Sequence, residues 1–200
     1  MSRGKFIVFE GIDGAGKSTQ IQLLAVALRE RGFDVVTSRE PTDGPWGRKL
    51  RESATTGRMS AADELEYFIR DRTEHVATLI EPSLASGFWV IVDRYYYSTI
   101  AYQGVRGLDP KALRQQMESL FPKPDRVFVL DLDPATAVTR IQSGRGEAPN
   151  EFEKREELER IRGIFLSLDG PEMAVIDANR PASEVHQAIL RALPGGSQGS

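Results

Sequence analysis

The feature that most constrains this 200-residue chain is a short apolar run that breaks into glycines and continues with a helical pattern. Residues 6–9 read Phe-Ile-Val-Phe, and the spacing G-x-x-x-x-G-K-[ST] is then matched by Gly11, Gly16, Lys17 and Ser18. Apolar residues at helical spacing follow at positions 21, 24, 25 and 28. In such a strand-loop-helix unit, backbone N–H groups converge at a helix N-terminus, where the helix dipole also favours an anion. The stretch therefore predicts a phosphate-binding loop.

The same motif assigns roles within a nucleoside triphosphate site. Lys17 should reach the β- and γ-phosphates, and the Ser18 hydroxyl should bind Mg²⁺. The expected nucleotide-binding residues are Gly11, Ile12, Asp13, Gly14, Ala15, Gly16, Lys17, Ser18 and Thr19. The alternative is a glycine-rich turn with an exposed lysine, but the flanking strand and helix favour the nucleotide site.

Composition and charge narrow the class of protein. A hydrophobic fraction of 40% and a charged fraction of 28% are ordinary for one globular domain. A net charge of −3 argues against a nucleic-acid polymer as partner, whereas a small phosphorylated ligand needs only a local group of arginines. The chain has no cysteine, which excludes disulfides and a thiol nucleophile and suits a cytoplasmic protein. Because the apolar runs are only as long as strands, we expect no membrane span.

Five apolar runs separated by helical patterns predict an α/β fold. After the first strand, strands are expected at residues 34–38, 88–94, 126–132 and 173–176, and the longest helical pattern covers residues 61–85. This alternation implies right-handed crossovers and a five-stranded parallel sheet with helices on both faces. Ligands of such sheets bind at the carboxyl ends of the strands.

Charged side chains end two of these strands. Arg39 and Glu40 follow the second strand, and Asp93 and Arg94 complete the third. A carboxylate at the end of a buried strand beside a phosphate loop is a typical Mg²⁺ ligand, directly or through water. The adjacent arginine suits a protein that must hold a second anion. Arg39 is either a surface charge or an anion clamp, and its position favours the clamp.

Two further segments leave alternatives open. Arg72 falls on the apolar stripe of the long helix, where it could extend out to solvent; alternatively, Phe68 stacks on a base and Arg72 donates to its edge. Residues 143–150 are rich in glycine and polar residues and are expected to form a loop between helices. That loop is either a plain connector or a lid that brings Arg145 onto the phosphates.

The chain resembles the thymidylate kinase family in its phosphate loop, Arg39-Glu40-Pro41, Phe68 with Arg72, Asp93-Arg94-Tyr95 and Ala101-Tyr102-Gln103-Gly104. The resemblance covers about residues 5–193. It implies the architecture of the P-loop nucleoside monophosphate kinases and a cytoplasmic homodimer that phosphorylates dTMP to dTDP with ATP and Mg²⁺, in dTTP biosynthesis. One kinase domain over residues 1–193 is expected, with a lid at about 143–152 and a disordered tail at 194–200.

The resemblance also implies roles for single residues. The catalytic set would be Lys17, Arg39, Arg94 and Arg145. Thymine would stack on Phe68 and accept from Arg72 at O4, while Tyr102 packs against the sugar. The full set of contacts to dTMP would be Asp13, Arg39, Arg51, Phe68, Arg72, Arg94, Ser98, Thr99, Tyr102 and Gln103. The metal side would be formed by Ser18, Glu40 and Asp93.

Arginine placement distinguishes members of this family. Some carry an arginine inside the phosphate loop, at the position that is Gly14 here, so the catalytic arginine is expected from the lid as Arg145, with Arg140 beside the adenine. The chain departs from the family pattern at Thr42-Asp43, where Gly-Gly is usual, and at Pro149-Asn150, where Asp-Arg is common in the lid.

Other functions remain possible from the sequence. A kinase for another nucleoside monophosphate or a nucleoside would share the donor site and differ at Phe68, Arg72, Thr99 and Gln103. A nucleotide-dependent switch is disfavoured because the chain lacks an N-K-x-D motif for guanine and its third strand ends in Asp-Arg. An inactive binding module is the third possibility.

Overall fold

The computed structural model describes residues 3–145 and 151–194. The strands are β1 (Phe6–Glu10), β2 (Val35–Arg39), β3 (Trp89–Asp93), β4 (Arg126–Asp131) and β5 (Met173–Asp177). The helices are α1 (Lys17–Glu30), α2 (Pro45–Thr56), α3 (Ala61–His75), the π-helical turn η1 (Val76–Ile80), α4 (Glu81–Ala85), α5 (Tyr96–Val105), α6 (Pro110–Leu120), α7 (Pro134–Arg145), α8 (Glu151–Ser167) and α9 (Ala182–Arg191).

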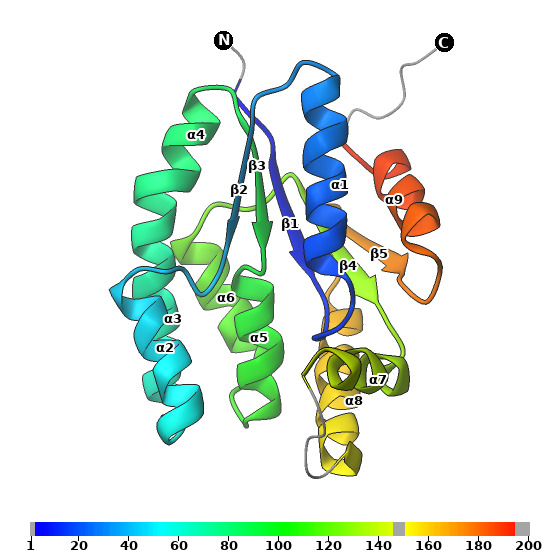
Figure 1. The fold of residues 1–200 in the computed structure, drawn as a ribbon. Helices are drawn as coiled ribbons and strands as arrows, with labels where there is room; N and C mark the ends of the chain where they lie inside the picture. The colour runs from blue at the N-terminus through cyan, green and yellow to red at the C-terminus, as the bar shows by residue number, and fades with distance from the viewer. Residues whose placement is uncertain (1–2, 146–150, 195–200) are drawn as a thin grey trace.

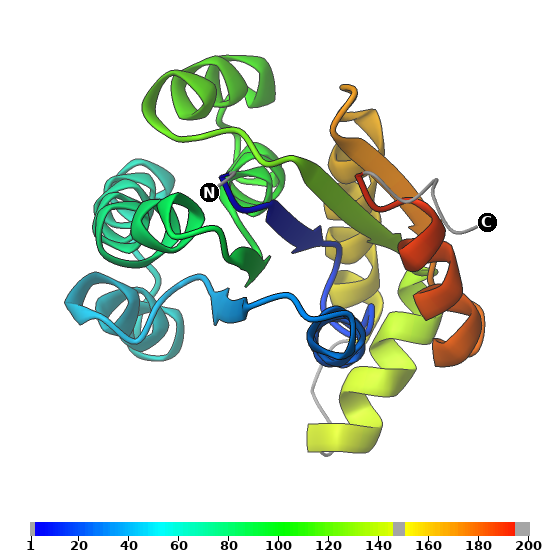
Figure 2. The same ribbon diagram turned by 90° about the horizontal axis from the view of Figure 1, so that it is seen from above.

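The five strands form one parallel sheet in the order β2-β3-β1-β4-β5 (Figure 1). Helix α1 and, beside it, α9 pack on one face, and α4 and α8 pack on the other, with α5 against α8 (Figure 2). The predicted fold class, a five-stranded parallel sheet with helices on both faces, is confirmed. None of the helices in residues 3–145 and 151–194 combines the length and apolar character needed to cross a membrane.

The central strands explain why the sequence shows continuous apolar runs. Every residue of β1 is buried, and in β3 only Asp93 at the carboxyl end is partly exposed. A parallel strand covered on both faces has no solvent side, so β-branched and aromatic residues occupy consecutive positions instead of alternating with polar ones. The ring of Phe9 on β1 packs against that of Phe128 on β4, with centroids 5.2 Å apart.

The predicted helices agree with the structure except around the lid. The long helix predicted over residues 61–85 is present as α3, η1 and α4 in succession. Helix α7 continues to Arg145, past its predicted end near residue 140, and α8 begins at Glu151. The predicted lid, at about residues 143–152, is therefore helical at residues 143–145 and 151–152, and its remaining part, 146–150, lies outside the described residues.

The register of the sheet brings the functional segments to one edge. Asp93 on β3 is paired with Phe9 on β1 and with Arg39 on β2. The phosphate loop, which follows β1, therefore begins beside the residues that end β2 and β3. Helices α2, α5 and α7 lie at this end of the sheet (Figure 1).

Candidate functional site

The phosphate loop depends on glycine at two crowded positions. Gly11 has φ +133°, and a Cβ there would lie 2.6 Å from the carbonyl oxygen of Leu130 on β4. Gly14 has φ +82°, and a Cβ there would lie 3.1 Å from the carbonyl oxygen of Ala137 on α7. Residues with a side chain rarely adopt such positive φ values, so any other residue would be strained at either position. The same crowding disfavours an arginine at position 14.

Lys17 begins α1 and folds back over the loop. Its Nζ donates to the carbonyl oxygens of Gly11 and Ile12, each at 3.1 Å. An ammonium group has three N–H donors, so one remains for a phosphate oxygen. Burial and the nearby charge of Arg94 lower the pKa of Lys17 to about 8. Asp93, Asp13 and Glu10 oppose this shift, and a bound phosphate would add further negative charge that favours the charged lysine.

Ser18 and Asp93 form the metal side of the loop. The Ser18 hydroxyl donates to Asp93 Oδ2 at 3.2 Å, while Asp93 Oδ1 is buried and has no hydrogen-bond partner among the described residues. An orphaned carboxylate oxygen beside a hydroxyl fits an oxygen-preferring cation such as Mg²⁺, which keeps several waters and phosphate oxygens as ligands. The described part of the chain has no cluster of three or more His, Cys, Asp or Glu that could hold a metal by itself.

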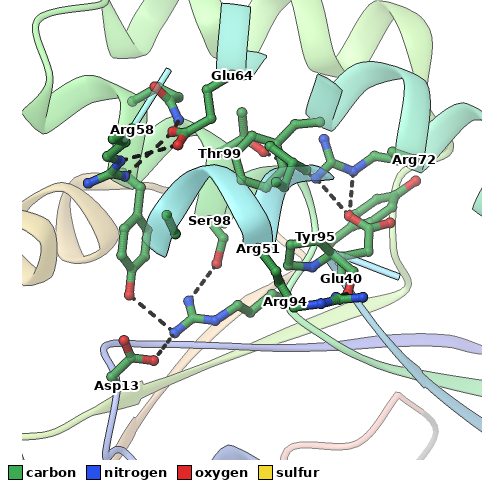
Figure 3. A pocket seen from close by; sticks show the side chains of 16 residues that line it. Asp13, Glu40, Arg51, Arg58, Glu64, Arg72, Arg94, Tyr95, Ser98 and Thr99 are labelled. Atoms are coloured by element: carbon green, nitrogen blue, oxygen red, sulfur yellow. Dashed lines mark hydrogen bonds and ion pairs between the residues drawn. The ribbon is translucent and has the colours of Figure 1, made fainter. Parts of the chain in front are cut away.

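Arg94 follows β3 in a strained backbone conformation. Its φ is +68°, the only positive value of a non-glycine residue in the described ranges. Such strain persists only where surrounding contacts fix it, and it is common at functional sites. The guanidinium donates to Ser98 Oγ and Asp13 Oδ1, both at 2.8 Å, and to the Tyr102 hydroxyl at 3.1 Å (Figure 3). Burial opposes its charge, but Tyr102 and Asp13 raise the pKa above the ordinary arginine value.

Glu10, at the end of β1, supports this arrangement and was not predicted. Its fully buried carboxylate accepts from the backbone N–H groups of Tyr95 and Ser98, at 2.8 and 3.1 Å, and so caps the N-terminus of α5. It also accepts from the Ser98 hydroxyl at 2.6 Å, and that hydroxyl oxygen in turn accepts from Arg94. Burial raises the pKa of Glu10 to about 7, although Arg94 and Lys17 oppose the shift.

A cavity of about 320 Å³ lies between α2, α3 and α5 (Figure 3). A volume of this order suits a small organic ligand. All of the predicted acceptor contacts except Arg39 line it. The lining residues are Asp13, Glu40, Pro41, Leu50, Arg51, Ala54, Arg58, Glu64, Phe68, Arg72, Arg94, Tyr95, Ser98, Thr99, Tyr102 and Gln103.

Arg72 forms part of the cavity wall and does not extend out to solvent, since it is only 1% exposed. Its Nε donates to Glu40 Oε2 at 2.8 Å, and its Nη2 donates to Thr99 Oγ1 at 3.1 Å. The guanidinium also lies over the rings of Tyr95 and Phe121, at 5.1 and 5.3 Å from their centroids. These contacts hold a buried cation in one orientation, as recognition of a base edge requires.

Glu40, which was predicted on the metal side, makes its side-chain contacts with Arg72 and His75. While Oε2 accepts from Arg72, its Oε1 lies 2.9 Å from His75 Nδ1, and His75 Nε2 lies 2.8 Å from Ser38 Oγ. Both carboxylate oxygens therefore belong to a buried network behind the cavity. This geometry gives Glu40 a role in fixing Arg72; because Glu40 also lines the hollow over the phosphate loop, its role on the metal side stays a prediction.

A second buried glutamate organises the other end of the cavity. Glu64 lies on α3, one turn before Phe68, and accepts from the side-chain amide of Gln103 on α5. It also pairs with Arg58, at 3.2 Å, and with Arg106. The predicted base-edge residue Gln103 is thus fixed by a carboxylate, and its Oε1 lies 3.4 Å from Arg106 Nη1.

Two of the predicted phosphate-binding arginines donate hydrogen bonds to the same carboxylate. Arg39 and Arg51 both donate from Nη2 to Asp43 Oδ1, each at 2.9 Å. Arg51 also donates to the carbonyl oxygen of Pro41 at 2.9 Å and lines the cavity. Arg39 lies outside this cavity and lines the hollow over the phosphate loop instead.

That second hollow has a volume of about 400 Å³ and includes most of the predicted nucleotide-binding residues. It is lined by Asp13, Gly14, Gly16, Lys17, Ser18, Thr19, Arg39, Glu40, Asp93 and Arg94. The two cavities share Asp13, Glu40 and Arg94. Two spaces suited to anions therefore meet at the Arg94 guanidinium.

The arginines assigned to the lid are described only in part. Arg140 on α7 donates to the carbonyl oxygen of Gly14 at 3.3 Å and so lies beside the phosphate loop. Arg145 is the last residue of α7, but its side chain lies outside what the structure describes. Its catalytic role stays a prediction.

Several lining or supporting residues were missed by the sequence reasoning. Glu64 lies four residues before Phe68 and eight before Arg72, so the same helical spacing could have indicated it. Glu10 carries no comparable signal, because its partners Tyr95 and Ser98 lie 85 and 88 residues further along the chain. Asp43 and Arg58 have partners nearby in the sequence but lie outside helices and strands, where no periodic pattern indicates a pairing. The other missed lining residues are Pro41, Leu50, Ala54 and Tyr95.

Known proteins resemble this chain over nearly its whole length. A family model described as thymidylate kinase matches residues 9–189. The thymidylate kinase of Xanthomonas euvesicatoria pv. vesicatoria (strain 85-10) is 50% identical over 194 residues, covering 95% of this chain and 85% of the relative. The thymidylate kinase of Akkermansia muciniphila is 48% identical over 191 residues, covering 96% of this chain and 92% of the relative.

Proposed function

The chain belongs to the thymidylate kinase family, and we propose that it holds ATP over the phosphate loop and dTMP in the cavity between α2, α3 and α5. As an ATP-dependent thymidylate kinase it transfers the γ-phosphoryl group of ATP to dTMP, giving ADP and dTDP on the route to dTTP. The observation that carries the residue-level proposal is the position of Arg94, which lines both cavities.

The donor side works mainly through the backbone of the loop. Loop amides and Lys17 would hold the β- and γ-phosphates, and Ser18 with Asp93 would hold Mg²⁺. When bound, Mg²⁺ neutralises charge on the β- and γ-phosphates. Arg140, which contacts the loop at Gly14, would lie beside the adenine.

The acceptor side works through side chains. Phe68 stacks on the thymine, Arg72 donates to O4, and Thr99 and Gln103 contact the remaining base edge. Tyr102 packs against the deoxyribose near Asp13. The contacts of Arg72 with Glu40 and of Gln103 with Glu64 support these roles, because each fixes a donor before the base arrives.

The reaction needs positioning and charge neutralisation more than proton transfer. Charge spreads over the equatorial oxygens of the transferred group, and the acceptor phosphate is already an anion at pH 7. No strong general base is therefore required. Arg94 and Arg51 bring the acceptor phosphate in line, Arg39 lies at the boundary of the two cavities, and Arg145 would approach from the lid.

Acceptor specificity tests this proposal. ADP release, measured with a coupled assay, should be fast with dTMP and slow with dAMP, dGMP and dCMP. Faster turnover of another nucleoside monophosphate would show that the cavity selects a different base. Slow hydrolysis that no acceptor stimulates would indicate a nucleotide-dependent switch.

The family resemblance also predicts a cytoplasmic homodimer. Sedimentation at micromolar concentration tests the oligomeric state, and a single species of monomer mass would contradict it.

A further inference from the structure

Asp43 places a carboxylate between Arg51, which lines the acceptor cavity, and Arg39, which lines the adjoining phosphate hollow. Its Oδ1 accepts from Arg39 and Arg51 at 2.9 Å each, and its Oδ2 accepts from Arg39 at 3.1 Å. The side chains are 72%, 65% and 41% exposed for Asp43, Arg39 and Arg51. One exposed carboxylate thus satisfies two guanidinium groups at the rim of the site.

The backbone on either side fixes the position of this carboxylate. The N–H and the hydroxyl of Thr42 donate to the two oxygens of Asp71, a buried residue of α3, at 2.8 and 2.6 Å. Arg48 donates to the carbonyl oxygen of Asp43 at 2.7 Å. A Cβ on Gly47 would lie 2.0 Å from the carbonyl oxygen of Thr42, so α2 packs closely against this segment. Asp43 is therefore not part of a loosely held surface loop.

The contacts of Asp43 are those that a phosphate would make. A carboxylate and a phosphate both offer paired oxygens to the fork of an arginine, and the phosphate carries the larger charge. We propose that Asp43 is an internal counter-anion that holds Arg39 and Arg51 until the phosphate of the acceptor displaces it. This inference rests on the proposed function, since it takes the displacing ligand to be a dianionic phosphate monoester.

Selectivity by charge follows from this competition. Exposed ion pairs are weak, so a dianion that binds both arginines can displace the carboxylate. A monoanion would only replace the single negative charge of Asp43 with another single negative charge, so its binding would be weak. Asp43 therefore makes the rim selective for dianionic phosphates, at the expense of some affinity for dTMP.

A charge-removing substitution tests the proposal. Asp43→Asn should lower the KM for dTMP about 3- to 10-fold at low ionic strength, with a smaller change at high salt. It should strengthen inhibition by inorganic phosphate and make acetate, a monoanion, inhibitory as well. Glu74→Gln is the matched control: Glu74 lies near Gly44 in the same region, and its side chain has no hydrogen bond or ion pair with the described residues. That control should leave the KM unchanged.

Two further results separate competition from positioning. In the Asp43→Asn background, Arg51→Gln should abolish the gain in affinity for inorganic phosphate measured by calorimetry. An unchanged or higher KM for dTMP in Asp43→Asn, with unfolding temperature unaltered, would overturn the proposal and indicate that Asp43 only positions the arginines. The phosphate measurement does not require dTMP, so failure of the parent enzyme to use dTMP would refute the proposed function separately.

Discussion

The donor and acceptor sides of the site are built in different ways. On the donor side, six of the ten residues that line the phosphate hollow come from residues 13–19, and Lys17 is held by carbonyls of its own loop. On the acceptor side, Arg72 on α3 reaches Glu40 after β2 and Thr99 on α5, with sequence separations of 32 and 27 residues. One side uses backbone geometry, and the other uses buried charges from several elements.

This difference indicates where specificity and stability are linked. A loop of backbone amides binds phosphate whatever base is attached to it, so it contributes little to acceptor choice. The acceptor cavity buries Arg72, Glu40 and Glu64, whose charges are tolerable only when paired. Changes on that side should therefore affect folding and specificity together, whereas removal of the Lys17 charge from the loop should affect catalysis alone.

The largest effect is expected at Arg94, where the two sides meet. Arg94→Ala should lower kcat/KM for dTMP by about 10³-fold or more, because an arginine that stabilises this transition state is worth about 10³ to 10⁵ in rate. ATP affinity should change little, since Lys17 and the loop amides remain. Steady-state kinetics and ATP titration measure the two quantities.

The control for Arg94 is Arg155→Ala, which removes an exposed arginine of α8 that pairs with Glu159. It should leave both quantities unchanged. Turnover of Arg94→Ala within 10-fold of the parent rate would mean that Arg94 does not contribute to phosphoryl transfer between the two cavities.

The next effect contrasts the buried cations of the two sides. Arg72→Met leaves Glu40 buried with His75 as its remaining side-chain hydrogen-bond partner, and should lower the free energy of unfolding by about 3–5 kcal/mol. Lys17→Met should leave it unchanged or raise it, because burial already disfavours the charge of Lys17. Urea denaturation measures both values.

Adding Glu40→Gln to Arg72→Met should recover part of the lost stability, because the uncompensated charge is then gone. Equal losses for the Arg72 and Lys17 variants would contradict the distinction between a charge-paired acceptor side and a backbone-built donor side.

A smaller effect should come from Glu10, which connects β1 to Arg94 through Ser98. Its pKa is raised from 4.5 to about 7, so the folded state binds its proton more tightly than the unfolded state does. The resulting stabilisation is complete below about pH 4.5 and is lost as the pH rises through about 7. The stability of Glu10→Gln relative to the parent should therefore improve by about 2–3 kcal/mol between pH 4.5 and pH 8.

Denaturation at both pH values tests this, and the control is Glu66→Gln, at an exposed position of α3. A constant difference between parent and Glu10→Gln across the range would show that Glu10 does not titrate there.

The smallest effect concerns the methyl group of thymine. One methyl group in an apolar pocket is worth about 1–3 kcal/mol, so dUMP should be phosphorylated with a kcat/KM about 10- to 200-fold below that of dTMP. Equal efficiency for the two acceptors would refute a methyl-sized pocket on the acceptor side.

The same contrast explains what the sequence could and could not predict. The strands, the parallel sheet and the phosphate loop follow from local patterns, because apolar runs and glycine spacing act within a few residues of each other. Phe68 and Arg72 could be paired from helical spacing. The family resemblance implies a metal-side role for Glu40, whereas in the structure its carboxylate pairs with Arg72 on α3, a contact that no local pattern indicates. The pairing of Asp43 with two arginines likewise depends on how α2 and the β2 end meet in three dimensions.

The most direct test of this account is a crystal structure of the enzyme with dTMP and an unreactive ATP analogue. The account predicts the thymine ring stacked on Phe68, the dTMP phosphate on Arg94 and Arg51, and the γ-phosphate of the analogue above Lys17 on the opposite side of Arg94. A thymine ring bound away from Phe68, or the two phosphates bound without a shared contact to Arg94, would contradict it.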